Sequence, residues 1–239
     1  MTAPEVPVYG AGDALPDPLE AGAFLVDKPP RLTSFAVVRR VRRALGIKKV
    51  GHAGTLDPMA TGLLVVLVGR VATRAQDAFM GLPKTYTGTL RLGETTPSFD
   101  ADTPVDVRVP ADHVTDADLE AVRARFEGEI TQVPPVFSAI KVGGQRLYQK
   151  ARKGMEVEVP PRRVAIYRLA WTGRRGADVD FEVECSKGTY VRSLAHDVGQ
   201  ALGVGAHLVA LRRTAIGPYR VEDAFALDTL APRPQPEAT

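Results

Sequence analysis

Two observations predict a fold of the mixed α/β or α+β class for this chain of 239 residues. Segments with the two-residue alternation of a strand and segments with the period of a helix follow one another in no regular order. A regular parallel sheet would instead require strands and helices in steady alternation. The hydrophobic content of 44% and the charged content of 25% are ordinary for a globular protein with a core of its own.

The first part of the chain predicts an arm, a short strand and a helix. Residues 1–22 are rich in Pro, Ala and Gly and are expected to form a flexible arm. The strand candidate 24–26 is ended by a turn at Pro29 and Pro30. Ser34 is expected to cap a helix that Gly46 ends, with its apolar positions at helical spacing: Val38, Val41 and Leu45.

Two strands are predicted after this helix. The run 63–68 is continuously apolar, as expected for a strand buried on both faces. The segment 85–93 alternates, so that Tyr86, Leu90 and Leu92 share one face. This second strand is therefore predicted to be half-buried, with Tyr86 on its apolar side.

The second half of the chain adds a helix, a long loop, a strand and a further helix. Thr115 and Asp118 have the spacing of a capping box before an acidic amphipathic helix. The region 132–163 contains three Pro or Gly pairs among basic residues, and a loop of that length is usually functional or disordered. The segment 179–185 alternates cleanly as a strand, and a turn at 186–188 leads into a helix. The last residues, 232–239, are expected to form a disordered tail.

Basic residues are concentrated near the N-terminus, although the net charge is only +3. No acidic residue interrupts the run, whose members are Lys28, Arg31, Arg39, Arg40, Arg42, Arg43, Lys48 and Lys49. The region 100–129 is, in contrast, rich in Asp and Glu. Such asymmetry suggests a polyanionic partner, but a solvated helix face is the alternative reading of the same pattern.

Several classes of protein are disfavoured by composition. The single cysteine, Cys185, forms no internal disulfide and provides no zinc cluster, and the four histidines lack metal-ligand spacing. The N-terminus has no signal-peptide pattern, and the longest apolar run is too short to span a bilayer. We therefore expect a cytoplasmic protein without metal and without membrane contact.

Asp57 is the most distinctive candidate for chemistry. It lies in a Gly-punctuated loop just before the predicted buried strand, and loops held by a rigid strand commonly carry catalytic groups. An Asp before Pro58 is also a common turn or capping residue. Local spacing alone leaves both readings open and favours the second.

Four sequence blocks lie in order between about residues 23 and 220. The first two are Asp27-Lys28-Pro29 and Gly51-His52-x-Gly54-x-Leu56-Asp57-Pro58-x-Ala60-Thr61-Gly62. The third is Pro134-Pro135-x-x-Ser138-Ala139-x-Lys141 with Gly144-x-Arg146-x-Tyr148-x-x-Ala151-Arg152. The fourth is Cys185-Ser186-Lys187-Gly188-Thr189-Tyr190-x-Arg192, followed by Gly205-Ala206-His207 and Leu211-Arg212-Arg213. Together they resemble the TruB family of tRNA pseudouridine synthases.

This resemblance implies an α+β fold with a mixed, mostly antiparallel central sheet and flanking helices. It implies one catalytic domain over 23–231, with an RNA-binding insertion at about 132–163. The expected activity is that of an isomerase that converts uridine-55 in the T loop of tRNA to pseudouridine. The expected partner is the T stem-loop of tRNA, and neither a cofactor, a guide RNA nor an obligate protein partner is expected, so that the protein would act as a monomer.

The resemblance also assigns roles to individual residues. Asp57 becomes the nucleophile, because a carboxylate can attack carbon covalently, and Arg192 would hold it ionised. Tyr86 and Tyr190 would contact the flipped base, and Tyr86 would also transfer a proton. His52 would insert against displaced nucleotides, and Leu211 would contact the substrate. Core packing is the alternative for Tyr86 and Leu211, and a surface helix position is the alternative for Arg192.

Basic residues in two regions are expected to contact the RNA backbone, where they would position the substrate without reading its sequence. The first set lies before residue 50: Lys28, Arg39, Arg40, Arg42 and Arg43. The second set lies in the predicted insertion: Lys141, Arg146 and Arg152.

The chain departs from the family pattern at its C-terminal end. Family members often carry an additional RNA-binding domain after the Leu-Arg-Arg block, whereas this sequence ends in a short Pro-rich tail. This difference favours the guide-free, bacterial type of enzyme. Three alternatives remain: a synthase for another RNA or one that needs a guide, a non-catalytic tRNA-binding or folding protein, and a glycoside hydrolase. The last would need a second carboxylate, which the sequence does not clearly offer.

Overall fold

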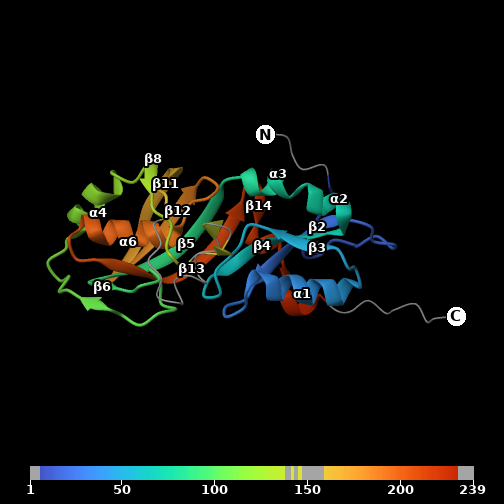
Figure 1. Ribbon diagram of the computed structural model, residues 1–239, viewed down its shortest axis with the longest axis horizontal. Coiled ribbons are helices and arrows are strands. Elements are labelled where there is room, and N and C mark those ends of the chain that lie inside the picture. The colour runs from blue at the N-terminus through green and yellow to red at the C-terminus, as the bar shows by residue number, and fades with distance from the viewer. Residues whose placement is uncertain (1–5, 138–140, 143–144, 147–158, 231–239) are drawn as a thin grey trace. The chain divides into compact units, whose positions relative to one another are not determined.

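The computed structural model describes residues 6–137, 141–142, 145–146 and 159–230 (Figure 1). The chain divides into two compact units. The first unit comprises residues 1–86 and 212–239, and the second comprises residues 87–211. Two strands, β5 (Lys84–Leu92) and β13 (Ala206–Ile216), each contribute residues to both units.

The sheet of the first unit is built around two long antiparallel strands, β2 (Gly22–Lys28) and β4 (Thr61–Val68). All residues of β4 after Thr61 are buried, which confirms the predicted strand 63–68. β1 (Val8–Tyr9) and β15 (Phe225–Ala226) run parallel to β2. The remaining neighbours are β3 (Val50–Ala53), antiparallel to β4; the C-terminal part of β13, parallel to β4; and β14 (Tyr219–Arg220), antiparallel to β13.

The helix predicted after the first strand is confirmed as α1 (Ser34–Leu45), which buries Val37, Val38 and Val41. It ends at Gly46, whose left-handed backbone (φ 70°) suits a residue without a Cβ atom. The predicted cap was wrong by one residue. The N-cap is Thr33, whose hydroxyl accepts a hydrogen bond from the Ala36 amide, and this leaves the Ser34 side chain available for another contact.

Short helices complete the first unit. α2 (Gly69–Arg74) and α3 (Gln76–Gly81) follow β4 directly. Two single turns of 3₁₀ helix, Val221–Asp223 and Leu227–Thr229, lie near the end of the described chain.

Part of the segment expected to be a flexible arm has regular structure. Within residues 6–22, β1 pairs with β2, and both Val6 and Leu19 are buried in the core of the first unit. The apolar residues of this segment are too few and too scattered to show a period, so no sequence pattern predicted the strand. The expected tail, residues 232–239, and residues 1–5 lie outside the described residues.

In the second unit, the strands follow the order β5, β12 (Asp178–Cys185), β11 (Arg162–Arg175) and β8 (Gly128–Gln132). The pairings of β11 with both neighbours are antiparallel, so the mixed, mostly antiparallel sheet is confirmed. Two short antiparallel pairs are also present: β6 (Glu94–Thr95) with β7 (Val107–Arg108), and β9 (Lys141–Val142) with β10 (Gln145–Arg146).

Two helices of the second unit, α4 (Asp116–Arg123) and α6 (Val191–Ala201), lie in contact (Figure 1). The capping box of Thr115 and Asp118 is confirmed, as is the buried alternation of β12. The 14-residue strand β11 was not predicted. Register shifts near Ile166 and Trp171 interrupt its two-residue period, so the sequence shows no clean alternation.

Candidate active site

The loop that carries Asp57 connects β3 to β4 and is fixed through its backbone. The hydroxyl of Ser34 accepts a hydrogen bond from Leu56 N–H (2.9 Å) and donates to Leu56 C=O (3.1 Å). The carbonyl of Asp57 accepts from Ala60 N–H (3.2 Å), and Arg31 N–H donates to Pro58 C=O (2.8 Å). Asp57 itself is half-buried. Because these hydrogen bonds fix the backbone of the loop, the position from which its carboxylate projects is also fixed.

Lys28 is a structural lysine, contrary to the expected phosphate contact. Its side chain is fully buried, with 0% exposure. The ammonium donates to the carbonyl oxygens of Pro29 (2.9 Å), Leu32 (2.8 Å) and Pro58 (3.2 Å). Because a buried ammonium needs several acceptors, Lys28 ties the β2–α1 connection to the Asp57 loop and is not exposed to a phosphate.

Arg213 supports the other side of the same loop, a role that sequence reasoning missed. Its guanidinium is buried and donates to the carbonyls of Leu63 (2.7 Å) and Gly54 (3.1 Å). It also lies 6.0 Å from the centre of the Tyr86 ring, within cation–π range. Tyr86 is only 9% exposed, so the ring is packed as the alternative reading anticipated. The Leu-Arg-Arg block was the only sequence sign of Arg213.

Gly62 is required for the close approach of β13 to β4. It has a left-handed backbone (φ 99°), and a Cβ atom placed there would lie 2.3 Å from the carbonyl oxygen of Arg213. The neighbouring Arg212 forms a two-point ion pair with Asp27, at 2.8 and 3.1 Å. The first, second and fourth sequence blocks therefore meet within the first unit.

His52 lies on β3 opposite Val66 and is half-buried. Burial and, to a smaller extent, the charge of Arg213 hold the pKa of its imidazole below the usual value, which favours the neutral form of the ring. Within the described residues its Nδ1 atom has no hydrogen-bond partner. A neutral, flat ring beside the Asp57 loop is suited to contact with a nucleobase.

In the second unit, Arg192 is buried rather than on a helix surface. It donates to the carbonyls of Ser98 (3.0 Å) and Phe137 (3.1 Å) and lies 3.4 Å from the carboxylate of Asp100. Asp100 is itself 2% exposed and accepts hydrogen bonds from the Ser98 hydroxyl and the Asp102 amide. No local pattern in the sequence predicted this buried carboxylate. The expected pairing of Arg192 with Asp57 would join residues of different units and stays a prediction.

The loop that holds Asp100 has an unusual backbone. Phe99 adopts a left-handed conformation (φ 62°), which is rare for a residue other than glycine. Its ring stacks on His196 of α6 with centroids 3.8 Å apart. This contact holds the carbonyl of Ser98 and the carboxylate of Asp100 toward Arg192 on the same helix.

Tyr190 is the N-cap residue of α6 and is half-buried. Its backbone N–H and C=O both bind the side-chain amide of Gln132, at 2.7 and 3.0 Å. The guanidinium of Arg162 lies 5.4 Å from the centre of its ring. Leu211, which was expected to contact the substrate, is 8% exposed, which agrees with its alternative reading as a packed residue.

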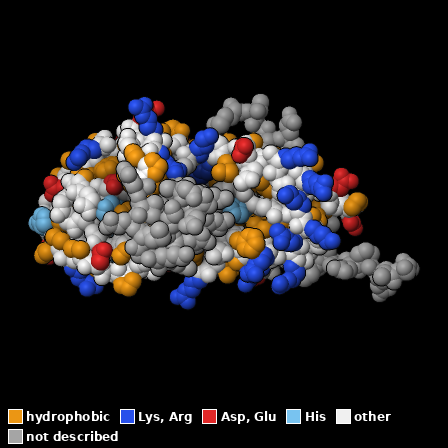
Figure 2. All heavy atoms as spheres, viewed as in Figure 1, with side chains coloured by type: hydrophobic (Ala, Val, Ile, Leu, Met, Phe, Trp, Pro, Cys, Tyr) orange, Lys and Arg blue, Asp and Glu red, His pale blue; other side chains and the backbone are white. Residues whose placement is uncertain are grey.

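The expected RNA-backbone residues divide into three groups. Arg39, Arg40 and Arg43 are exposed on α1, where Arg39 lies over the ring of Phe35 (5.8 Å) and Arg40 pairs with Asp228 (3.2 Å). Figure 2 shows Lys and Arg side chains gathered over the part of the first unit that contains α1.

Arg42 is the exception on this helix: it points inward, donates to the carbonyl of Val50 and is only partly exposed. Arg42 therefore differs from Arg39, Arg40 and Arg43, whose side chains are exposed. In the insertion, Lys141 and Arg146 are opposite each other across β9 and β10, and Arg152 lies outside the described residues.

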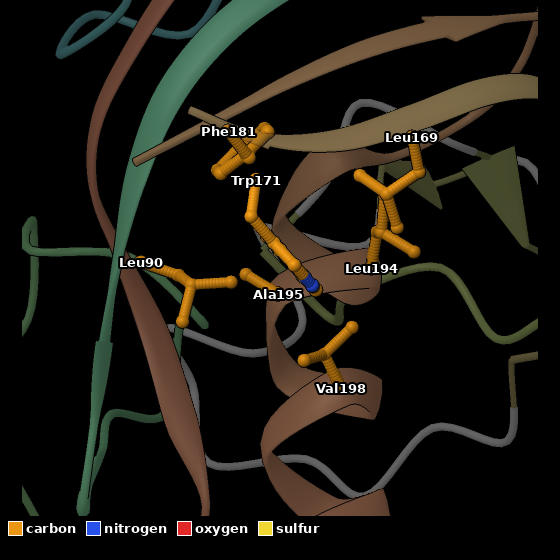
Figure 3. A pocket seen from close by; sticks show the side chains of 7 residues that line it. All are labelled: Leu90, Leu169, Trp171, Phe181, Leu194, Ala195 and Val198. Atoms are coloured by element: carbon orange, nitrogen blue, oxygen red, sulfur yellow. The ribbon is translucent and has the colours of Figure 1, made fainter. Parts of the chain in front are cut away.

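The second unit contains a small apolar cavity between its sheet and α6 (Figure 3). It measures about 10 Å³, and its lining consists of Leu90, Leu169, Trp171, Phe181, Leu194, Ala195 and Val198. A void of that size barely admits one water molecule, and its apolar walls offer water no partner. It is a packing defect of the core and cannot receive a nucleotide.

Two structural features are absent from the described residues. No helix among them is long and apolar enough to cross a membrane. No group of three His, Cys, Asp or Glu side chains in the same ranges is arranged to hold a metal ion.

Comparison with solved structures supports the fold. The chain resembles the structure titled "Crystal Structure of a Cbf5-Nop10-Gar1 Complex" with a TM-score of 0.68 and 30% identity, covering 95% of this chain and 60% of that one. It also resembles "Structure of H/ACA RNP bound to a substrate RNA containing 2'-deoxyuridine" with a TM-score of 0.64 and 31% identity, covering 86% and 51%. The chain thus spans only 51–60% of the length of these two proteins.

Comparison by sequence is more extensive. The family described as "TruB family pseudouridylate synthase (N terminal domain)" matches residues 42–191, and "tRNA pseudouridylate synthase B C-terminal domain" matches residues 192–233. The protein named tRNA pseudouridine synthase B of Opitutus terrae is 49% identical, covering 90% of this chain and 89% of the relative. That of Thermobifida fusca is 52% identical, covering 88% and 74%. The chain belongs to the TruB family of pseudouridylate synthases.

Proposed function

We propose that the protein isomerises uridine-55 in the T loop of tRNA to pseudouridine, without a guide RNA and with Asp57 as the nucleophile. The observation that carries this proposal is the anchored Asp57 loop, in which Ser34, Lys28 and Arg213 bind the backbone on both sides of the aspartate. The sequence relatives that share most of the chain are named tRNA pseudouridine synthase B, which supports the same substrate class.

The reaction breaks the N1–C1′ bond of uridine, turns the base and forms a C5–C1′ bond. The Asp57 carboxylate attacks C1′ as the N1–C1′ bond breaks, and the electron pair of that bond leaves with the base. C5 of the turned base then attacks C1′ and displaces the carboxylate. The proton on C5 is lost to a base, and a proton on N1 completes the product. Because uridine and pseudouridine are isomers, the reaction involves no net oxidation or reduction, and the proposal invokes no cofactor.

The other residues to which the family resemblance gives a role are assigned supporting functions. Arg192 favours the ionised form of the carboxylate and fixes its direction, and the Tyr86 hydroxyl moves a proton. Tyr190 replaces the stacking that the flipped base loses. His52, whose neutral form is favoured by its partial burial, packs against the displaced loop nucleotides.

The T arm is proposed to dock on the exposed basic residues of α1. Arg39 and Arg43 face outward on one side of that helix, and no acidic residue lies between Lys28 and Lys49 in the sequence. Contacts of this kind position the duplex through its phosphates.

A tRNA transcript that carries 5-tritiated uridine tests the proposal. The purified protein, without any guide RNA, should release tritium, and mapping should place pseudouridine at uridine-55. Asp57→Asn should abolish the release while binding to tRNA remains, whereas the exposed control Asp112→Asn should behave like the wild type. Substantial turnover by Asp57→Asn would remove Asp57 from the mechanism.

The same assay tests two of the alternatives, a guide-dependent synthase and a non-catalytic tRNA-binding protein. A guide-dependent synthase would release tritium only when a guide RNA is added; the solved structures similar to this chain include one titled as an H/ACA RNP. A non-catalytic tRNA-binding protein would bind the transcript and release no tritium under either condition.

A further inference from the structure

We infer that Gln132 is a positioning residue for the active site: it holds the residue at which α6 begins and thereby sets the places of Tyr190 and Arg192. This inference rests on the proposed function, because it assumes that these two side chains serve the reaction. All residues involved belong to the second unit.

The first step is the burial of Gln132. It is the last residue of β8 and only 1% exposed. A buried amide is costly unless its polar atoms are satisfied, so its partners are informative. Its Oε1 atom accepts from Tyr190 N–H (2.7 Å), and its Nε2 atom donates to Tyr190 C=O (3.0 Å).

The second step is the position of Tyr190 at the helix start. The amide groups at the start of a helix have no partner within the helix, and the Tyr190 side chain caps none of them. The Tyr190 carbonyl accepts the first helical bond from Leu194 N–H (3.1 Å) in addition to the bond from Gln132. Gln132 therefore binds the N-cap residue at both backbone groups and fixes where α6 begins.

The third step is the arrangement of the neighbouring strand. Gln132 and Arg162 are directly opposite each other across β8 and β11, so their side chains are on the same face of the sheet. Gln132 binds the backbone of Tyr190, and the guanidinium of Arg162 lies over its ring. Tyr190 is thus held at two points by one cross-strand pair.

The fourth step extends this control to Arg192. The helix turn after Tyr190 is bound to the chain that follows Gln132: Ser193 Oγ donates to Val133 C=O (2.8 Å), and Arg192 donates to Phe137 C=O (3.1 Å). A shift of the N-cap would therefore move the guanidinium of Arg192 as well as the ring of Tyr190. Misplacement by about 1 Å can cost about 100-fold in rate.

The test compares Gln132→Met, which keeps the length and removes both polar groups, with Gln132→Glu, which keeps an acceptor for Tyr190 N–H. The control is Gln200→Met, an exposed position at the other end of α6. Single-turnover rates at saturating tRNA and the Kd for tRNA are measured well below each unfolding midpoint, together with amide exchange at Tyr190.

Gln132→Met should lose about tenfold or more in the single-turnover rate while its Kd changes by less than about threefold. Gln132→Glu should recover part of the rate, and the Tyr190 amide should exchange faster in Gln132→Met alone. A rate equal to that of Gln200→Met would overturn the inference, as would a loss confined to Kd or to the unfolding midpoint. A wild-type protein that binds tRNA without turnover would instead overturn the proposed function, and amide exchange would still report whether Gln132 holds Tyr190.

Discussion

The hydroxyl of Ser34 forms hydrogen bonds with both backbone groups of Leu56: it accepts from the N–H at 2.9 Å and donates to the C=O at 3.1 Å. Ser34 is the first residue of α1, and Leu56 immediately precedes Asp57. One side chain therefore satisfies both backbone groups of a buried residue and connects α1 to the loop of the proposed nucleophile.

Ser34→Ala is expected to leave both polar groups of Leu56 without this partner, at a cost of about 1–3 kcal/mol in the free energy of unfolding. Pseudouridine formation should fall as well, because the Asp57 loop loses an anchor. Urea unfolding and the tritium-release assay measure the two effects. Thr33→Ala is the control: it removes the exposed helix cap, costs about 1 kcal/mol and should leave turnover unchanged. Equal turnover in the two variants would contradict the anchoring role.

The partly buried carboxyl of Asp197 on α6 should make the stability of the protein depend on pH. Burial raises the pKa of its carboxyl from 3.8 to about 6. Between these values the folded protein binds more protons than the unfolded chain, so this group lowers stability as the pH rises from about 4 to about 6. Its unfavourable contribution is complete above that window.

Asp197→Asn should therefore increase the urea midpoint more at about pH 7.5 than at about pH 4.5. His52 and His196, whose pKa values are lowered by burial, act in the opposite direction, but both proteins retain them. Asp112→Asn, at an exposed position, should show no such difference. If Asp197→Asn increased the urea midpoint by the same amount at both pH values, the pKa of this carboxyl would not be raised in the folded protein.

The small cavity beside α6 predicts an asymmetry between two core substitutions (Figure 3). Leu194→Ala removes a buried side chain and enlarges a void that already exists, so it should cost about 2–5 kcal/mol. Val198→Ile adds one methylene next to that void and should change stability by less than about 1.5 kcal/mol. Urea unfolding measures both, and a large loss from Val198→Ile would mean that the cavity cannot accept the added group.

Elements with a clean period were predictable from the sequence. The alternation of β12, the unbroken apolar run of β4 and the capping box of α4 each depend on local rules that the structure confirms. β11 was missed because its bulges interrupt the alternation, and β1 because it is only two residues long.

The roles of individual polar residues were less predictable, because they depend on burial. Lys28 reads in sequence as one of several basic residues, yet only the fold surrounds it with three carbonyl groups. The same holds for Arg42, which is directed toward Val50 by β3, and for Asp100, which lies more than ninety residues from Arg192 in the chain. Contacts between residues so distant in sequence have no local signature.

The outward and inward arginines of α1 make the docking proposal testable within a single helix. Arg39 and Arg43 are exposed, whereas Arg42 is only partly exposed and donates to Val50 C=O. Each phosphate contact contributes close to one unit to the slope of log K against log salt. Arg39→Ala and Arg43→Ala should therefore each reduce the magnitude of this slope for tRNA binding by about one. Each should also lower the affinity for all tRNAs to the same extent.

Arg42→Ala is the matched control for this experiment. It removes the same charge from the same helix, so any general effect of net charge is retained, but no phosphate contact is lost. Its slope should equal that of the wild type, while its urea midpoint falls because the Val50 carbonyl loses a donor. If all three variants changed the slope equally, the effect would come from the overall field of the protein. If none did, α1 would face away from the RNA, and the docking surface would have to lie elsewhere.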